Sequence, residues 1–111
     1  MKVLVVDDDV VSRMMLMHLV DSCGSHEILE AEDGEDAWRQ LEAGLAPGIV
    51  FCDLRMPRLS GLELLARMRA HADHARRRFV LVSAAADAGE RERLLAGVAR
   101  LGVHLAAFQP S

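Results

Sequence analysis

Short, largely apolar runs alternate with longer segments of helical periodicity along the chain. Short apolar runs bounded by turn residues are typical of buried parallel strands, and apolar residues three or four positions apart are typical of amphipathic helices. The predicted strands are 2–6, 27–31, 49–52, 79–82 and 103–108, and the predicted helices are 10–23, 35–43, 62–72 and 88–101. Such alternation predicts right-handed βαβ units and a parallel α/β sheet.

Local residues mark the ends of the first helix. Asp9 is suited to cap helix 10–23 at its start, and Gly24 follows at the position where glycine commonly ends a helix. The spacing of apolar residues also suggests which side of this helix faces the sheet. The residues expected on that inward stripe are Val11, Met14, Met15, Leu19 and Val20.

Composition narrows the class of protein. The 111 residues fit a single domain, 1–111, and a hydrophobic content of 51% supplies a core. The net charge of -4 argues against direct binding to nucleic acid. We find neither an apolar stretch of about 20 residues nor a signal-peptide core, so no membrane association is expected. Cys23 and Cys52 match no zinc or redox spacing, which favours reduced thiols and a cytoplasmic protein.

Acidic residues follow two of the predicted strands. The run 7–9 consists of three aspartates after strand 2–6, and Asp53 follows strand 49–52. If these strands are parallel neighbours, their carboxyl ends meet at the edge where open α/β sheets bind ligands. Crowded carboxylates repel one another unless a cation or proton lies among them. A hard divalent ion, Mg²⁺ (or Mn²⁺), is the simplest occupant.

The residues at the strand ends permit phosphoryl chemistry. An aspartate carboxylate such as that of Asp53 can attack a phosphoryl group and form an acyl phosphate. Mg²⁺ held by Asp7, Asp8 and Asp53 would neutralise the charge of the two reacting anions. Ser83 follows strand 79–82 and offers a hydroxyl that can donate a hydrogen bond to the transferred group.

Several short segments at the predicted strand and helix ends form a specific set. They are VVDD at 5–8, EAEDG at 30–34, DLRMP at 53–57, LSGLEL at 59–64 and VSA at 82–84. In these segments the chain resembles the receiver domain of two-component response regulators, and the resemblance runs from residue 1 to residue 110.

The resemblance implies a flavodoxin-like, doubly wound fold. Its five-stranded parallel sheet would have the order 2-1-3-4-5, with helices on both faces. It also implies a signalling domain rather than an enzyme, in which Asp53 accepts phosphate from a histidine kinase or phosphotransfer protein. By the same resemblance Asp7, Asp8 and Asp53 bind Mg²⁺ together with the backbone carbonyl of Arg55, and Ser83 occupies the position of the switch Ser/Thr.

The chain departs from the family at two positions near its end. Gln109 stands where receivers normally carry a lysine, and glutamine donates a hydrogen bond but has no charge. No other lysine can replace it, because Lys2 is the only one and lies at the amino end of the first strand. Ala106 stands where the family usually has an aromatic switch residue, and the chain contains no tyrosine.

Receivers also continue into a fifth helix beyond the proline near the end of the chain, whereas this sequence stops at Ser111. Either a partner or a second copy then covers the open sheet face, or the chain is a fragment of a longer protein. We therefore expect an exposed apolar strip near Val3, Val5 and the fifth strand, and a homodimer formed through it.

Two alternative functions remain. Gln109 and Ala106 favour a degenerate receiver that acts as a phosphorylation-independent interaction module, whereas the intact acidic set favours the phosphoacceptor. The run 7–11 also fits the D-x-D-x-V pattern of haloacid-dehalogenase-type phosphatases, with Asp7 as nucleophile. Those enzymes need a later lysine, which this chain does not have.

Overall fold

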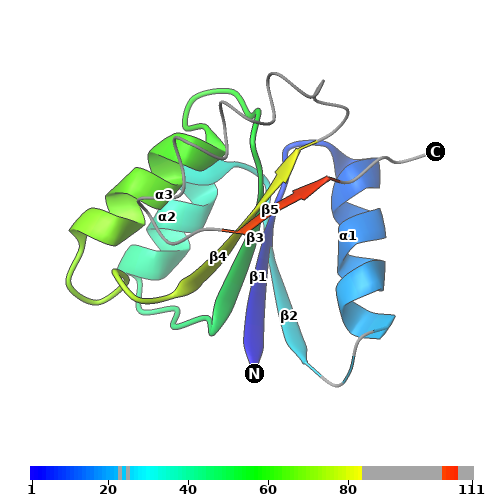
Figure 1. The fold of residues 1–111 in the computed structure, drawn as a ribbon, viewed down its shortest axis with the longest axis horizontal. Helices are drawn as coiled ribbons and strands as arrows, with labels where there is room; N and C mark the ends of the chain where they lie inside the picture. The colour runs from blue at the N-terminus through cyan, green and yellow to red at the C-terminus, as the bar shows by residue number, and fades with distance from the viewer. Residues whose placement is uncertain (23, 25, 84–103, 108–111) are drawn as a thin grey trace.

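The computed structural model describes residues 1–22, 24, 26–83 and 104–107 (Figure 1). Strands and helices alternate as predicted up to residue 83. The elements are β1 (Lys2–Val6), α1 (Val10–Ser22), β2 (Glu27–Ala31), α2 (Gly34–Glu42), β3 (Ile49–Asp53), α3 (Gly61–Ala70), β4 (Arg78–Ser83) and β5 (His104–Ala107). The predicted helix 88–101 and Gln109 lie outside the described residues.

The five strands form one parallel sheet in the order β2-β1-β3-β4-β5. This confirms the predicted flavodoxin-like fold class and strand order. The register pairs Val6 of β1 with Cys52 of β3, and Asp53 of β3 with Val82 of β4. The carboxyl ends of β1, β3 and β4 therefore reach the same edge of the sheet.

Helices cover both faces of the sheet. Figure 1 shows α1 on one face and α2 and α3 on the other. The larger core cluster lies beneath α2 and α3, where Leu64, Leu65 and Met68 of α3 pack with Phe79 of β4. A smaller cluster lies beneath α1 and consists of Val3, Val5, Leu16, Val20 and Val82.

The predicted inward stripe of α1 is wrong for most of its members. Leu16 and Val20 are the buried residues of this helix, whereas Val11, Met14 and Leu19 are 62%, 64% and 47% exposed. Apolar residues occupy nearly every side of α1, so periodicity alone did not select a face. None of the helices that the structure describes is long and apolar enough to cross a membrane.

The expected apolar strip is also wrong at Val3 and Val5. Both side chains are buried, because Leu16 and Val20 of α1 pack over them. The part of the strip expected on the fifth strand lies outside the side chains that the structure describes.

Capping residues set the starts of α2 and α3. The Asp33 side chain accepts a 2.7 Å hydrogen bond from the Asp36 N–H, so α2 begins at Gly34, one residue before the predicted start. Ser60 and Glu63 form a capping box, in which each side chain accepts from the other residue's N–H, and α3 begins at Gly61. The predicted helix 62–72 overran the end of α3, which lies at Ala70.

Candidate functional site

Three carboxylates meet at the carboxyl edge of the sheet. Asp7 and Asp8 follow β1, and Asp53 ends β3. One oxygen from each of the three carboxylates lies within 4.8 Å of the other two. Asp7 is buried, Asp53 is half-buried and Asp8 is exposed, so the cluster runs from the protein interior to its surface. The predicted convergence of the two acidic segments is confirmed.

Backbone contacts at the start of α1 hold Asp7 in place. Its Oδ1 accepts a 2.9 Å hydrogen bond from the Asp9 N–H. Its carbonyl oxygen accepts a 2.8 Å hydrogen bond from Nη1 of Arg13, one turn into the helix. Asp9 caps α1 as predicted, because its carboxylate accepts from the Ser12 N–H at 3.0 Å.

The end of β3 is packed closely against the first turn of α3. A Cβ placed at Gly61 would collide with the carbonyl oxygen of Asp53, so glycine is required for this approach. The Gly61 N–H donates to the Leu54 carbonyl at 3.1 Å, and the Leu54 N–H donates to the Val82 carbonyl at 2.9 Å. The backbone on both sides of the Asp53 carboxylate is thereby fixed.

Burial and mutual repulsion perturb the aspartates. Burial raises the pKa of Asp53 to about 6, with further increases from the negative charges of Asp7 and Asp8. The N–H groups of Leu54 and Arg55 oppose this rise in pKa. Burial also raises the pKa of Asp7. The hydrogen bond from the Asp9 N–H, and to a smaller extent the charge of Arg13, lower this pKa and partly offset the rise. Both carboxylates are thus held in a site that favours an added positive charge.

The donor set fits a hard divalent cation. All three groups are carboxylates, and oxygen is the ligand that Mg²⁺ and Mn²⁺ prefer. Mg²⁺ usually takes one or two protein carboxylates and keeps several waters, and Asp8 at the exposed side of the cluster leaves such an open side. The chemistry of these residues therefore agrees with the predicted metal site.

Comparison with known proteins points in the same direction. The family described as response regulator receiver domain matches residues 3–101. The chain belongs to this family. A chemotaxis protein, CheY1 of Helicobacter pylori, is similar at 31% identity over 96 residues, which are 86% of this chain and 76% of the relative.

Solved receiver structures have the same fold as this receiver domain. A response regulator receiver protein from Pseudomonas putida is 32% identical, with a TM-score of 0.78 over 95% of this chain and 82% of that one. The chemotaxis response regulator CheY4 of Vibrio cholerae is 22% identical, with a TM-score of 0.80 over 99% of this chain and 87% of that one. Receiver domains are signalling domains.

Two further predicted site residues, Ser83 and Arg55, lie at or just beyond strand ends at the same edge. Ser83 ends β4 one residue beyond Val82, the register partner of Asp53. Arg55 is exposed and lies two residues past Asp53, on the loop that leads to α3. Gln109 lies outside the described residues, so its place relative to Asp53 stays a prediction.

The sequence did not predict the contacts of two arginines, Arg13 and Arg58. Arg13 bonds the Asp7 carbonyl from one turn into α1. Arg58 has a left-handed backbone (φ 67°), and its guanidinium lies 3.7 Å from Asp33 and 4.0 Å from Glu35. The β3–α3 loop is thus tied to the start of α2. The signal available for Arg13 was its position in the first helix after the acidic run, whereas nothing local predicted Arg58.

Proposed function

We propose that Asp53 accepts a phosphoryl group from a histidine kinase or phosphotransfer protein in a reaction that depends on Mg²⁺ or Mn²⁺. The observation that carries the proposal is the half-buried Asp53 carboxylate, within 4.8 Å of oxygens from both Asp7 and Asp8. A nucleophile at the end of a central strand is open to solvent on one side and supported by fixed backbone on the other.

In the proposed transfer, a carboxylate oxygen of Asp53 forms a bond to phosphorus. The bond between phosphorus and the donor's imidazole nitrogen breaks, and the electron pair stays on that nitrogen, which is then protonated from solvent. The product is an acyl phosphate on Asp53.

The neighbouring residues have separate proposed roles. Asp7, Asp8, Asp53 and the carbonyl of Arg55 would hold the cation. A bound Mg²⁺ supplies positive charge to the phosphoryl oxygens, which lowers the repulsion between the two anions. The Ser83 hydroxyl would donate a hydrogen bond to the transferred group. Asp53 reacts in its ionised form, which predominates above a pKa of about 6.

Gln109 supports a second candidate function. An uncharged amide at the usual lysine position stabilises a phosphoryl group less than an ammonium does, so the signal is weakened or lost. Together with Ala106, this substitution favours a receiver that works through protein contacts alone. The family match over residues 3–101 gives no support to a phosphatase of the haloacid-dehalogenase type.

A homodimer through the sheet face beside α1 also stays a prediction. Because Val3 and Val5 are buried, its apolar contacts would come from exposed side chains of α1 such as Val11 and Met14. Analytical ultracentrifugation at tens of micromolar protein measures this directly, and a compact monomer alone would count against the dimer.

The experiment that separates the two functions is incubation with acetyl phosphate, read by intact mass. Wild type is compared with Asp53→Ala and Gln109→Lys, each with Mg²⁺ and with a chelator. A phosphoryl adduct on wild type that needs Mg²⁺ and is absent from Asp53→Ala supports the phosphoacceptor. An adduct on Gln109→Lys but not on wild type supports the contact module. No adduct on either protein contradicts the proposed transfer.

A further inference from the structure

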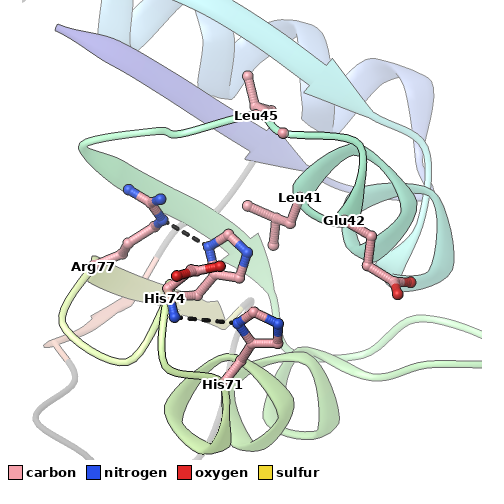
Figure 2. Close-up of a pocket in the computed structure, with 8 residues that line it drawn as sticks. Leu41, Glu42, Leu45, His71, His74 and Arg77 are labelled. Carbon is pink, nitrogen blue, oxygen red and sulfur yellow. Dashed lines mark hydrogen bonds between the residues drawn. The ribbon is translucent and has the colours of Figure 1, made fainter.

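A second group of titratable side chains lies at the opposite edge of the sheet from Asp53. It is formed by the segment between α3 and β4, which precedes the amino end of β4. A pocket of about 440 Å³ opens here between this segment and the end of α2. Figure 2 shows Leu41 and Leu45 on one side of the pocket, facing His71, His74 and Arg77 on the other.

His74 is buried, with 4% of its surface exposed, and its ring makes two hydrogen bonds. Its Nδ1 accepts a 2.8 Å hydrogen bond from Nε of Arg77 (Figure 2). The ring also donates to the backbone of Leu41 on α2. One ring nitrogen is an acceptor and the other a donor, so the arrangement requires the neutral imidazole.

Arg77 connects this histidine to two further segments. Its Nη1 donates to the Pro47 carbonyl, just before β3, at 3.1 Å. Its own carbonyl accepts a 2.8 Å hydrogen bond from Nη1 of Arg69 on α3. The His74–Arg77 pair therefore joins the end of α2, the approach to β3 and the end of α3.

The charged groups around His74 come from each neighbouring element. The cationic or basic ones are Arg77 on its own segment and Arg67, Arg69 and His71 at the end of α3. The acidic ones are Asp73 beside it and Glu42 of α2, across the pocket. Burial lowers the pKa of His74, the charges of Arg77 and His71 lower it further, and Asp73 and the Leu41 bond act in the opposite direction.

We propose that the His74–Arg77 pair is a proton-sensitive latch, which opens the pocket between α2 and the α3–β4 segment when His74 is protonated. An imidazolium has no acceptor nitrogen, so protonation removes the bond from Arg77 and sets two cations against each other. Release of either side chain frees the backbone of Leu41 or Pro47. The latch does not depend on phosphoryl transfer, because it lies at the other edge of the sheet.

Trp38 provides a local readout of this latch. Its ring centroid lies 5.8 Å from that of His71 and 6.0 Å from that of His74, and it is the only tryptophan in the sequence. Hydrogen–deuterium exchange locates the change along the chain. At each pH the parent is compared with a variant whose residue 74 does not titrate. Asp53, whose pKa is about 6, titrates in the same range, so all variants are made in an Asp53→Asn background.

The variant that tests the latch is His74→Gln. Its amide oxygen can accept from Arg77 and its amide N–H can donate to Leu41, but it does not titrate. His71→Gln, on the same segment, is the matched control. Because the pKa of His74 lies below the ordinary histidine value of about 6.5, the test runs from about pH 7.5 down to about pH 5.0. Over this range the parent and His71→Gln should lose exchange protection at 41–48 and 71–77 and change Trp38 emission. His74→Gln should keep both signals constant.

The latch would be overturned if His74→Gln and the parent lost exchange protection equally as pH falls. Constant exchange protection in the parent over this pH range would also overturn it. Should His74→Gln fail to fold, histidine ring NMR on the parent still decides. A His74 ring that titrates while the amides of Leu41 and of 71–77 shift with it supports the latch. Titration of His74 without those shifts refutes it.

Discussion

Gly61 determines how closely α3 approaches the proposed phosphoacceptor. A Cβ there would collide with the Asp53 carbonyl oxygen and lie 2.9 Å from a methyl group of Leu81. The first turn of the helix therefore packs directly on the end of β3, and the Gly61 N–H reaches the Leu54 carbonyl at 3.1 Å. The carboxylate of Asp53 is presented from backbone that has no room to shift.

Gly61→Ala should lower the free energy of unfolding by about 1–3 kcal/mol, because overpacking forces the backbone apart. Gly48→Ala is the matched control, since its new Cβ would meet mainly the flexible side chain of Met1. Urea unfolding measures both. Equal losses in the two variants would contradict the close packing of α3 on Asp53.

The orientation of α1 sets which of its residues support the sheet. Leu16 and Val20 cover Val3 and Val5, while Leu19 is 47% exposed. Arg13 adds a polar anchor at the start of the helix through the Asp7 carbonyl. These contacts turn the helix so that much of its apolar surface faces away from the sheet.

Leu16→Ala should therefore destabilise the domain by about 2–5 kcal/mol, as expected for a buried leucine. Leu19→Ala makes the same chemical change three residues further on, at an exposed position. It should lower the free energy of unfolding by less than about 0.5 kcal/mol. Thermal or urea unfolding of the two variants tests the orientation of α1. A larger loss of stability in Leu19→Ala than in Leu16→Ala would contradict this orientation and support the inward stripe predicted from the sequence.

Local signals predicted some features and had no access to others. The apolar runs before Asp7 and Asp53 placed both carboxylates at strand ends, and the parallel sheet then brought them together. The rotation of α1 was not predictable, because its periodicity was blurred by apolar residues on every side. The His74–Arg77 pair had no sequence signal either, since its partners Leu41 and Pro47 come from other elements and meet only in the folded chain.

Over the whole molecule, the two edges of the sheet carry titratable groups whose pKa values are shifted in opposite directions. At the carboxyl edge, burial and neighbouring charges raise the pKa of Asp53 from 3.8 to about 6. The folded state therefore binds a proton more tightly than the unfolded state, and this contribution to stability is lost as pH rises through about 6. At the amino edge the pKa of His74 is lowered, so its contribution is lost as pH falls below 6.5.

Asp53→Asn should accordingly be more stable than wild type at pH 7.5 without divalent cations. The difference should narrow as pH falls through about 6 and vanish only below 3.8, where Asp53 is largely protonated in both states. His74 is present in both proteins, so its effect cancels from the comparison. Mg²⁺ should stabilise wild type more than the variant, because it binds the folded carboxylates. Urea unfolding over a pH series checks this, and a difference independent of pH would be inconsistent with the repulsion at Asp53.

The phosphoacceptor role of Asp53 is tested most directly by locating the acyl phosphate. Borohydride reduces an aspartyl phosphate to homoserine, which peptide mass spectrometry then assigns to one position. After treatment with acetyl phosphate and Mg²⁺, we predict homoserine at position 53 and none when the cation is chelated. Homoserine at position 7 or 8 instead, or none at position 53, would contradict the assignment of Asp53.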